Sequence, residues 1–210
     1  MSSREPEAID DGNTRFKIAR KISDIGNAIT FSLLVGVLFS FIPPQVFPSW
    51  AVFLIAFLVM ILTPGAILVY AMKYKGVDFD FTDRSSRTPF YLSIEACYAA
   101  GILIFSPLII PSWSMFNLSI VSTLLNGVIL LINFKWKISA HAAGAAGPAT
   151  GIALVFGWWK LFIFGPVVLA IIWSRLVLKK HTIMQLVFGT IVAVACYSLV
   201  FAGLYPLNIF

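Results

Sequence analysis

The sequence predicts an all-α fold, a polytopic transmembrane helical bundle of six or seven spans, and three observations carry this prediction. Hydrophobic residues make up 60% of the 210 residues and charged residues only 11%, far from the composition of soluble domains. Apolar runs of roughly 20 residues, the length that crosses a hydrocarbon core of ~30 Å, recur along the chain. The basic residues lie in alternate connections between these runs.

The apolar runs define the expected spans. In chain order they cover approximately 26–42, 50–72, 90–110, 115–134, 139–158, 160–178 and 182–205. The count is six or seven because the fifth and sixth runs are interrupted by helix-breaking residues, Gly144, Gly147 and Pro148 in one and Gly165 and Pro166 in the other. Such residues are tolerated in a bundle whose neighbouring helices satisfy the freed backbone groups.

The chain is expected to divide into a basic N-terminal segment, 1–25, and a transmembrane domain, 26–210. The first segment is too polar at its start and too acidic for a cleaved secretory signal, so it is expected to be retained. One side of a helix would carry the apolar residues of this segment, Phe16, Ile18, Ile22 and Ile25. The flanking positions carry the basic residues, Arg15, Lys17, Arg20 and Lys21. The segment is predicted to be a helix in the lipid headgroup layer or a solvated basic leader.

The distribution of charge predicts the orientation in the membrane. With seven spans, the side that holds the N-terminus also receives the connections 73–89, 135–138 and 175–181. Every Lys and Arg of the chain except Lys160 lies on that side, which the preference of basic residues for the cytoplasmic face identifies as cytoplasmic. Anionic lipid headgroups account for the net charge of +6, and no nucleic-acid partner is expected.

Three segments on this face suggest chemistry. Arg84 and Arg87 lie three residues apart before a span and are able to share an anionic ligand. Ser139 and His141 are expected at a helix start, where free backbone N–H groups form an anion site.

The third segment, 174–185, holds the second of the two histidines in the chain. His181 and Gln185 are four residues apart, which predicts that they lie on adjacent turns of one helix. Gln185 is then able to hold the imidazole in one tautomer. Two histidines beside fixed positive charge at a membrane edge favour phosphoryl chemistry.

Taken in order, the three segments resemble the type 2 phosphatidic acid phosphatase family, also called lipid phosphate phosphatases, whose motifs are KxxxxxxRP, PSGH and SRxxxxxHxxxD. The resemblance covers about residues 73–190. Ser174-Arg175-x5-His181 matches the third motif residue for residue, and Ser139-Ala140-His141 matches the second at Ser and His. The departures are an inserted Thr in Arg87-Thr-Pro89, no Lys seven residues before either arginine, Ile138 and Ala140 for Pro and Gly, and Gln185 for the final Asp.

The resemblance implies a phosphohistidine mechanism, in which His181 attacks phosphorus, His141 protonates the leaving oxygen and water then releases phosphate. Phosphate would be held by basic and polar groups, Arg175, Arg84, Arg87, Lys137 and Ser139. The scheme requires no cofactor and no metal. The expected partners are membrane lipids and a lipid phosphate or diphosphate substrate, with prenyl or polyprenyl diphosphates first and glycerolipid phosphates second.

The replacement of the final Asp by Gln185 removes a negative charge from the partner of His181. The nearest compensating acid is Glu95, the only acidic residue after Asp83, and an ionisable residue at this depth of a span is a functional candidate. Asp78, Asp80 and Asp83 are the other candidates. The alternative is a helix-entry position for Glu95 and, for the three aspartates, a solvated loop that pairs with its own arginines.

Two other functions fit parts of the sequence. Asp78, Asp80 and Asp83 look like one aspartate-rich motif of Mg²⁺-dependent intramembrane prenyltransferases, but no Asp follows position 83 to form the second motif. The other alternative is a non-catalytic protein that binds a lipid phosphate or transports a solute.

Overall fold

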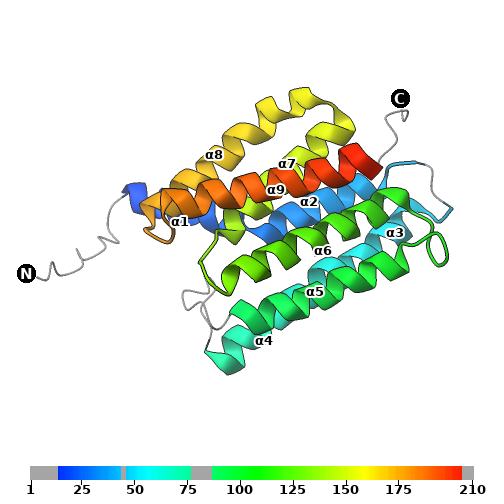
Figure 1. Ribbon diagram of the computed structural model, residues 1–210, viewed down its shortest axis with the longest axis horizontal. Coiled ribbons are helices and arrows are strands. Elements are labelled where there is room, and N and C mark those ends of the chain that lie inside the picture. Colours follow the sequence, from blue (N-terminus) through cyan, green and yellow to red (C-terminus); the bar gives the residue numbers. More distant parts are fainter. Residues whose placement is uncertain (1–13, 44–45, 77–86, 205–210) are drawn as a thin grey trace, which may run out of the picture.

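The computed structural model describes residues 14–43, 46–76 and 87–204, which form a bundle of helices without strands (Figure 1). In chain order the elements are α1 (Thr14–Ile25), α2 (Ala28–Ser40), α3 (Ser49–Ala56), the π-helix η1 (Phe57–Leu62), α4 (Thr63–Lys75), α5 (Arg87–Ile104), α6 (Trp113–Asn133), α7 (Ala140–Phe156), the 3₁₀-helix η2 (Trp158–Lys160), α8 (Leu161–Val177) and α9 (Ile183–Leu204).

Four helical stretches of the described chain are long and apolar enough to cross a membrane, namely Ser49–Lys75, Trp113–Asn133, Trp158–Val177 and Ile183–Gly203. The pair α1 and α2, bent by 43° at its break, adds a fifth if it counts as one span. α7 is apolar but has only 17 residues, and α5, which carries Arg87 and Glu95, is not among the four. The all-α prediction is confirmed with four or five candidate spans, whereas six or seven spans are not confirmed.

The second expected span forms one continuous helical stretch, α3-η1-α4, whose middle is wound as a π-helix. Pro64 follows this turn, and a proline inside a helix removes a backbone donor and clashes with the preceding turn. The wider turn of a π-helix accommodates the missing backbone donor of the proline. In addition, the Thr63 hydroxyl donates a hydrogen bond to the Leu58 carbonyl at 2.8 Å. The irregular turn places Met60 and Ile61 against the interior of the bundle.

Small residues on α7 let α9 approach closely and form the centre of the core. A Cβ at Gly147 would lie 2.5 Å from Cε2 of Tyr197, and one at Gly151 would lie 2.8 Å from Cδ1 of the same ring. Tyr197 in turn stacks on Phe201 with ring centroids 5.9 Å apart. Pro148 lies inside α7 without ending it, as expected for a helix enclosed by neighbours.

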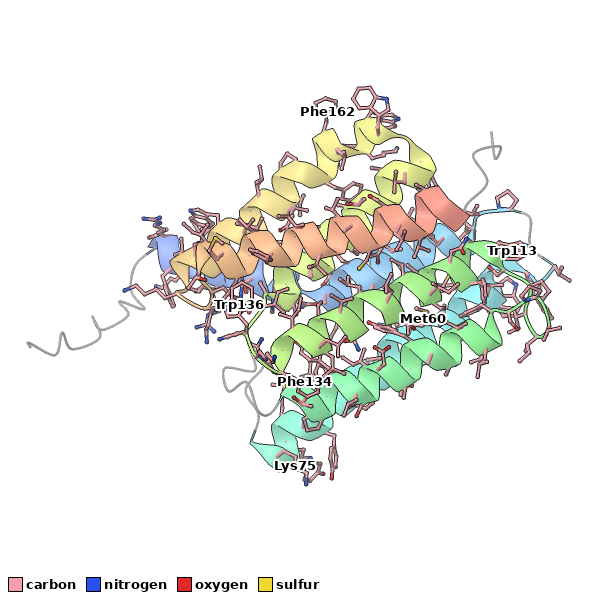
Figure 2. The ribbon with its side chains drawn as sticks, in the orientation of Figure 1. Met60, Lys75, Trp113, Phe134, Trp136 and Phe162 are labelled. Atoms are coloured by element: carbon pink, nitrogen blue, oxygen red, sulfur yellow. The ribbon has the colours of Figure 1, made fainter. Side chains whose placement is uncertain are left out.

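The two ends of the bundle differ in composition. The end of α8, the start of α9 and α1 lie together at the left of Figure 1, and Lys75 and Trp136 lie toward the same side in Figure 2. We call this the basic end. Trp113 lies at the opposite end (Figure 2). Lys160, the basic residue expected away from the others, has its Nζ 3.5 Å from the centroid of the Trp159 ring, a cation–π contact.

Residues 14–25 of the N-terminal segment form a helix that packs on the bundle, an arrangement that neither sequence interpretation anticipated. α1 lies against α8 and buries Ala19 and Ser23, which are one helical turn apart. A Cβ at Gly26, just after α1, would lie 2.5 Å from Cγ1 of Ile171, so a glycine permits this close contact. Ile18 and Ile25 remain exposed, which keeps an apolar surface on the outside of the helix.

Candidate active site

His181 is held in a short turn between α8 and α9 that is stabilised from both sides. On the α8 side, Lys179 adopts a left-handed conformation with φ 52°. Its N–H donates to Leu176 at 3.0 Å and the N–H of Lys180 donates to Arg175 at 3.1 Å. These two bonds form a Schellman motif, which ends a helix by satisfying its last carbonyls.

On the α9 side, Thr182 and Gln185 form a capping box. The Thr182 hydroxyl accepts the Gln185 N–H at 3.3 Å, and Gln185 Oε1 accepts the Thr182 N–H at 3.1 Å. The same Oε1 lies 3.2 Å from Nδ1 of His181. The expected contact between His181 and Gln185 is therefore present, but its expected cause is wrong: His181 precedes α9, and the cap rather than helical spacing brings the side chains together.

The hydrogen bonds assign the proton on the His181 ring. Gln185 Oε1 is an acceptor because it receives the Thr182 N–H, so Nδ1 of His181 must be the donor to it. Nε2 then keeps its lone pair. Burial, with the positive charges of Arg175, Lys137 and Arg87, lowers the pKa of His181 from 6.5 to about 3. The imidazole is therefore neutral at physiological pH.

The second histidine is brought to the first by direct backbone contact between α7 and α9. Ser139 is the N-cap of α7, and its hydroxyl accepts the Ala142 N–H at 3.3 Å. The Ser139 N–H donates to the Gln185 carbonyl at 3.2 Å, and a Cβ at Gly189 would lie 2.7 Å from the Ser139 carbonyl oxygen. His141, in the first turn of α7, is half-buried.

Two arginines come to this region from different helices, and both are buried. Arg87 begins α5, is 3% exposed and donates from Nη1 to the Ile138 carbonyl at 3.3 Å. Arg175 is 1% exposed and donates from Nη1 to the Ser23 hydroxyl at 2.7 Å. Buried guanidinium groups that keep their charge give a site a strong attraction for anions.

A cavity of about 180 Å³ is lined by Arg87 but not by Arg175, Lys137, Ser139 or Gln185. His141, His181 and Arg87 line it together, and most of the remaining lining is apolar. No Asp or Glu of the described residues lines it. A polar, positively charged region continuous with an apolar pocket suits an amphiphilic anion.

Of the acids proposed to compensate for Gln185, only Glu95 is among the described residues, and its hydrogen-bond partner is not His181. Glu95 accepts the Asn126 amide at 2.6 Å between α5 and α6 and does not line the cavity. Asp80 and Asp83 lie outside the described residues, as do Asp78 of the alternative Mg²⁺ site and Arg84 of the phosphate-binding set. Lys137 is half-buried before α7 and acts on His181 through its charge.

Ser23 and Thr182 contribute to the site without having been predicted. The Thr182-x-x-Gln185 spacing was a readable signal, because Ser or Thr followed three residues later by Glu or Gln marks a capped helix start. No local signal points to Ser23, which lies 152 residues from Arg175 in the sequence.

Comparisons with known proteins return no relative. No protein-family model, no curated protein and no solved structure matches the chain. The structure is that of an all-helical protein with candidate membrane spans and a cavity lined by two histidines and an arginine.

Proposed function

We propose that the chain is a membrane lipid phosphatase of the lipid phosphate phosphatase type. It hydrolyses a phosphomonoester or diphosphate of an isoprenoid or glycerolipid through a phosphohistidine. The observation that carries the proposal is the shared cavity, in which both histidines and Arg87 meet a largely apolar lining. Such a cavity binds the phosphate at its polar end and the adjoining hydrocarbon at its apolar wall.

The neutral state of His181 supports its role as nucleophile. Attack requires the lone pair on Nε2, which the hydrogen bond from Nδ1 to Gln185 leaves available. Nε2 forms the new bond to phosphorus while the bond from phosphorus to the alcohol oxygen breaks. The positive charges of Arg175, Lys137 and Arg87 offset the charge on the nonbridging oxygens.

His141 is assigned the proton transfers. It donates a proton to the departing alcohol oxygen, then accepts one from the water that attacks the phosphohistidine and releases inorganic phosphate. Gln185 orients His181 but contributes no negative charge. The negative charge of the bound substrate must therefore offset the positive charges of Arg175, Lys137 and Arg87 around His181.

The proposed orientation places the basic end in the cytoplasm, with six or seven spans. Single cysteines at Lys75 and Leu108, in a protein lacking Cys97 and Cys196, test it. Leu108 is 93% exposed and lies between α5 and α6 in the sequence. An impermeant maleimide applied to intact cells is expected to label Leu108→Cys and to leave Lys75→Cys unlabelled; the reverse pattern would refute the cytoplasmic face.

The function is tested by phosphate release from a panel of isoprenoid and glycerolipid phosphates, with and without EDTA. Release that resists EDTA, is inhibited by vanadate and is lost in His181→Asn is expected. Trapped, radiolabelled protein is expected to carry an acid-labile phosphate that His181→Asn lacks. Release abolished by EDTA would instead favour a Mg²⁺-dependent enzyme, and binding without release from any substrate would favour a non-catalytic protein.

A further inference from the structure

A second, smaller cavity of about 20 Å³ lies deeper in the bundle than the first. The two cavities share lining residues from α2, η1, α5, α6, α7 and α9. These shared side chains separate one space from the other. We call three of them, Met60, Tyr98 and Tyr197, the partition.

The partition is fixed in place by its contacts. The Tyr98 hydroxyl lies beside Ser32 and the Tyr197 hydroxyl beside Ser122. The ring of Tyr197 rests against Gly147 of α7. The Ser119 hydroxyl, which donates to the Met115 carbonyl at 2.8 Å, lies 3.6 Å from Sδ of Met60. Side chains held by specific partners form a wall rather than a mobile filling.

The position and size of the larger cavity limit what it holds. Tyr98 lies eleven residues after Arg87 on α5, or roughly 16 Å at the helical rise of 1.5 Å per residue. The volume of about 180 Å³ is close to that of an engineered cavity of roughly 150 Å³ that holds one benzene molecule. By this comparison the space accepts on the order of seven non-hydrogen atoms, those of the phosphate group included.

The larger cavity is not enclosed. Ile29 on α2 lines it and is 37% exposed. A chain too long for the cavity can therefore extend beyond it.

We infer that Met60, Tyr98 and Tyr197 determine how much of a substrate's hydrocarbon chain is recognised, so that the site selects lipid phosphates by the single chain segment next to the phosphate. This inference rests on the proposed function. Only the first few carbons contact the protein interior, and the remainder of a long tail lies in the membrane.

Binding of soluble monoalkyl phosphonates with two to twelve carbons tests the inference, because their C–P bond is not hydrolysed. Dissociation constants measured by titration calorimetry are expected to fall about fourfold per methylene until the cavity is full, then to level off. In Met60→Ala, which opens the partition, the levelling is expected to move to longer chains. Met115→Ala is the matched control, because Met115 lines only the smaller cavity and its loss leaves the partition intact.

The outcomes separate the inference from the proposed function. A chain-length profile that is the same in wild type, Met60→Ala and Met115→Ala, or that shifts equally in both variants, overturns the role of the partition. If phosphonates bind with the expected profile but no alkyl phosphate is hydrolysed, the partition stands and the phosphatase fails.

Discussion

The α8–α9 turn, which carries His181, and the start of α7, which carries His141, are held in place by different means. The turn is fixed by its own residues, through the Schellman motif and the capping box. The start of α7 has one serine cap and is positioned by contact with α9. The difference indicates that His181 is oriented locally, whereas the place of His141 depends on helix packing.

The largest expected effect separates the roles of the two histidines. His181→Asn is expected to lower kcat by more than about 10⁴-fold, because loss of a nucleophile removes the covalent route. His141→Asn is expected to cost about 10²- to 10⁴-fold with alkyl phosphates. In the first turnover of 4-nitrophenyl phosphate, whose leaving group needs no proton, the cost at His141 should shrink while that at His181 persists. Equal losses with both substrates would contradict the assignment.

Gln185 tests whether local orientation of His181 matters. Gln185→Leu removes the acceptor for His181 Nδ1 and for the Thr182 N–H, and kcat is expected to fall about 10²-fold because the tautomer is no longer fixed. Gln185→Glu retains the capping box and adds the missing negative charge, so it should raise the pKa of His181. NMR titration of the imidazole and phosphate release measure the two effects. An unchanged pKa in Gln185→Glu would refute the direct contact.

Gly189 tests the dependence of α7 on α9. Gly189→Ala places a Cβ against the Ser139 carbonyl and is expected to lower the free energy of unfolding by about 1–3 kcal/mol, the usual cost of overpacking. Gly203→Ala is the control in the same helix, because nothing lies within 4 Å of its Cβ position. It is expected to raise stability by up to about 1 kcal/mol. Equal effects in thermal or denaturant unfolding would show that the α7–α9 contact is not tight.

The depressed pKa of His181 predicts how stability changes with pH. As the pH falls from 6.5 towards 3, the unfolded state takes up a proton that the folded state refuses, so stability is lost across this window. The slope attributable to one such group is at most about 1.4 kcal/mol per pH unit. Denaturant unfolding at several pH values should show a shallower slope in His181→Gln than in wild type. Parallel slopes would mean that His181 titrates normally.

The smallest expected effect concerns α1. Ser23→Ala removes the hydroxyl that accepts from Arg175, and KM is expected to rise about fivefold through loss of one hydrogen bond of roughly 1 kcal/mol, with kcat little changed. Thr190→Ala is the control, because the Thr190 hydroxyl donates to the Leu186 carbonyl within α9, and it should keep the wild-type KM. An unchanged KM in Ser23→Ala would show that α1 does not position Arg175.

The fold class was predictable because apolar composition and span length are properties of local sequence. The seven apolar runs correspond closely to the helices from α2 to α9, including α7 and α8, which continue through Pro148 and Pro166. The number of membrane spans was harder to predict, because α2 and α7 are short and α5 contains two charged residues. No periodic pattern in the sequence predicted the π-helix η1 before Pro64.

Within the candidate site, sequence spacing anticipated the contact of His181 with Gln185 but not the cap that creates it. It also favoured Glu95 as a compensating acid, which instead binds Asn126. Hydrogen bonds between distant segments decide such partners, and no local pattern reports them.

By itself, the sequence determined an apolar helical chain with its basic residues in alternate connections, because hydropathy and charge act over short stretches. Only the tertiary structure decided that the two histidines and Arg87 line one cavity, that Ser23 of α1 receives Arg175, and that Tyr98 and Tyr197 divide the interior. The physical reason is that burial, electrostatic surroundings and close helix contacts depend on residues far apart in the chain, which only packing brings together.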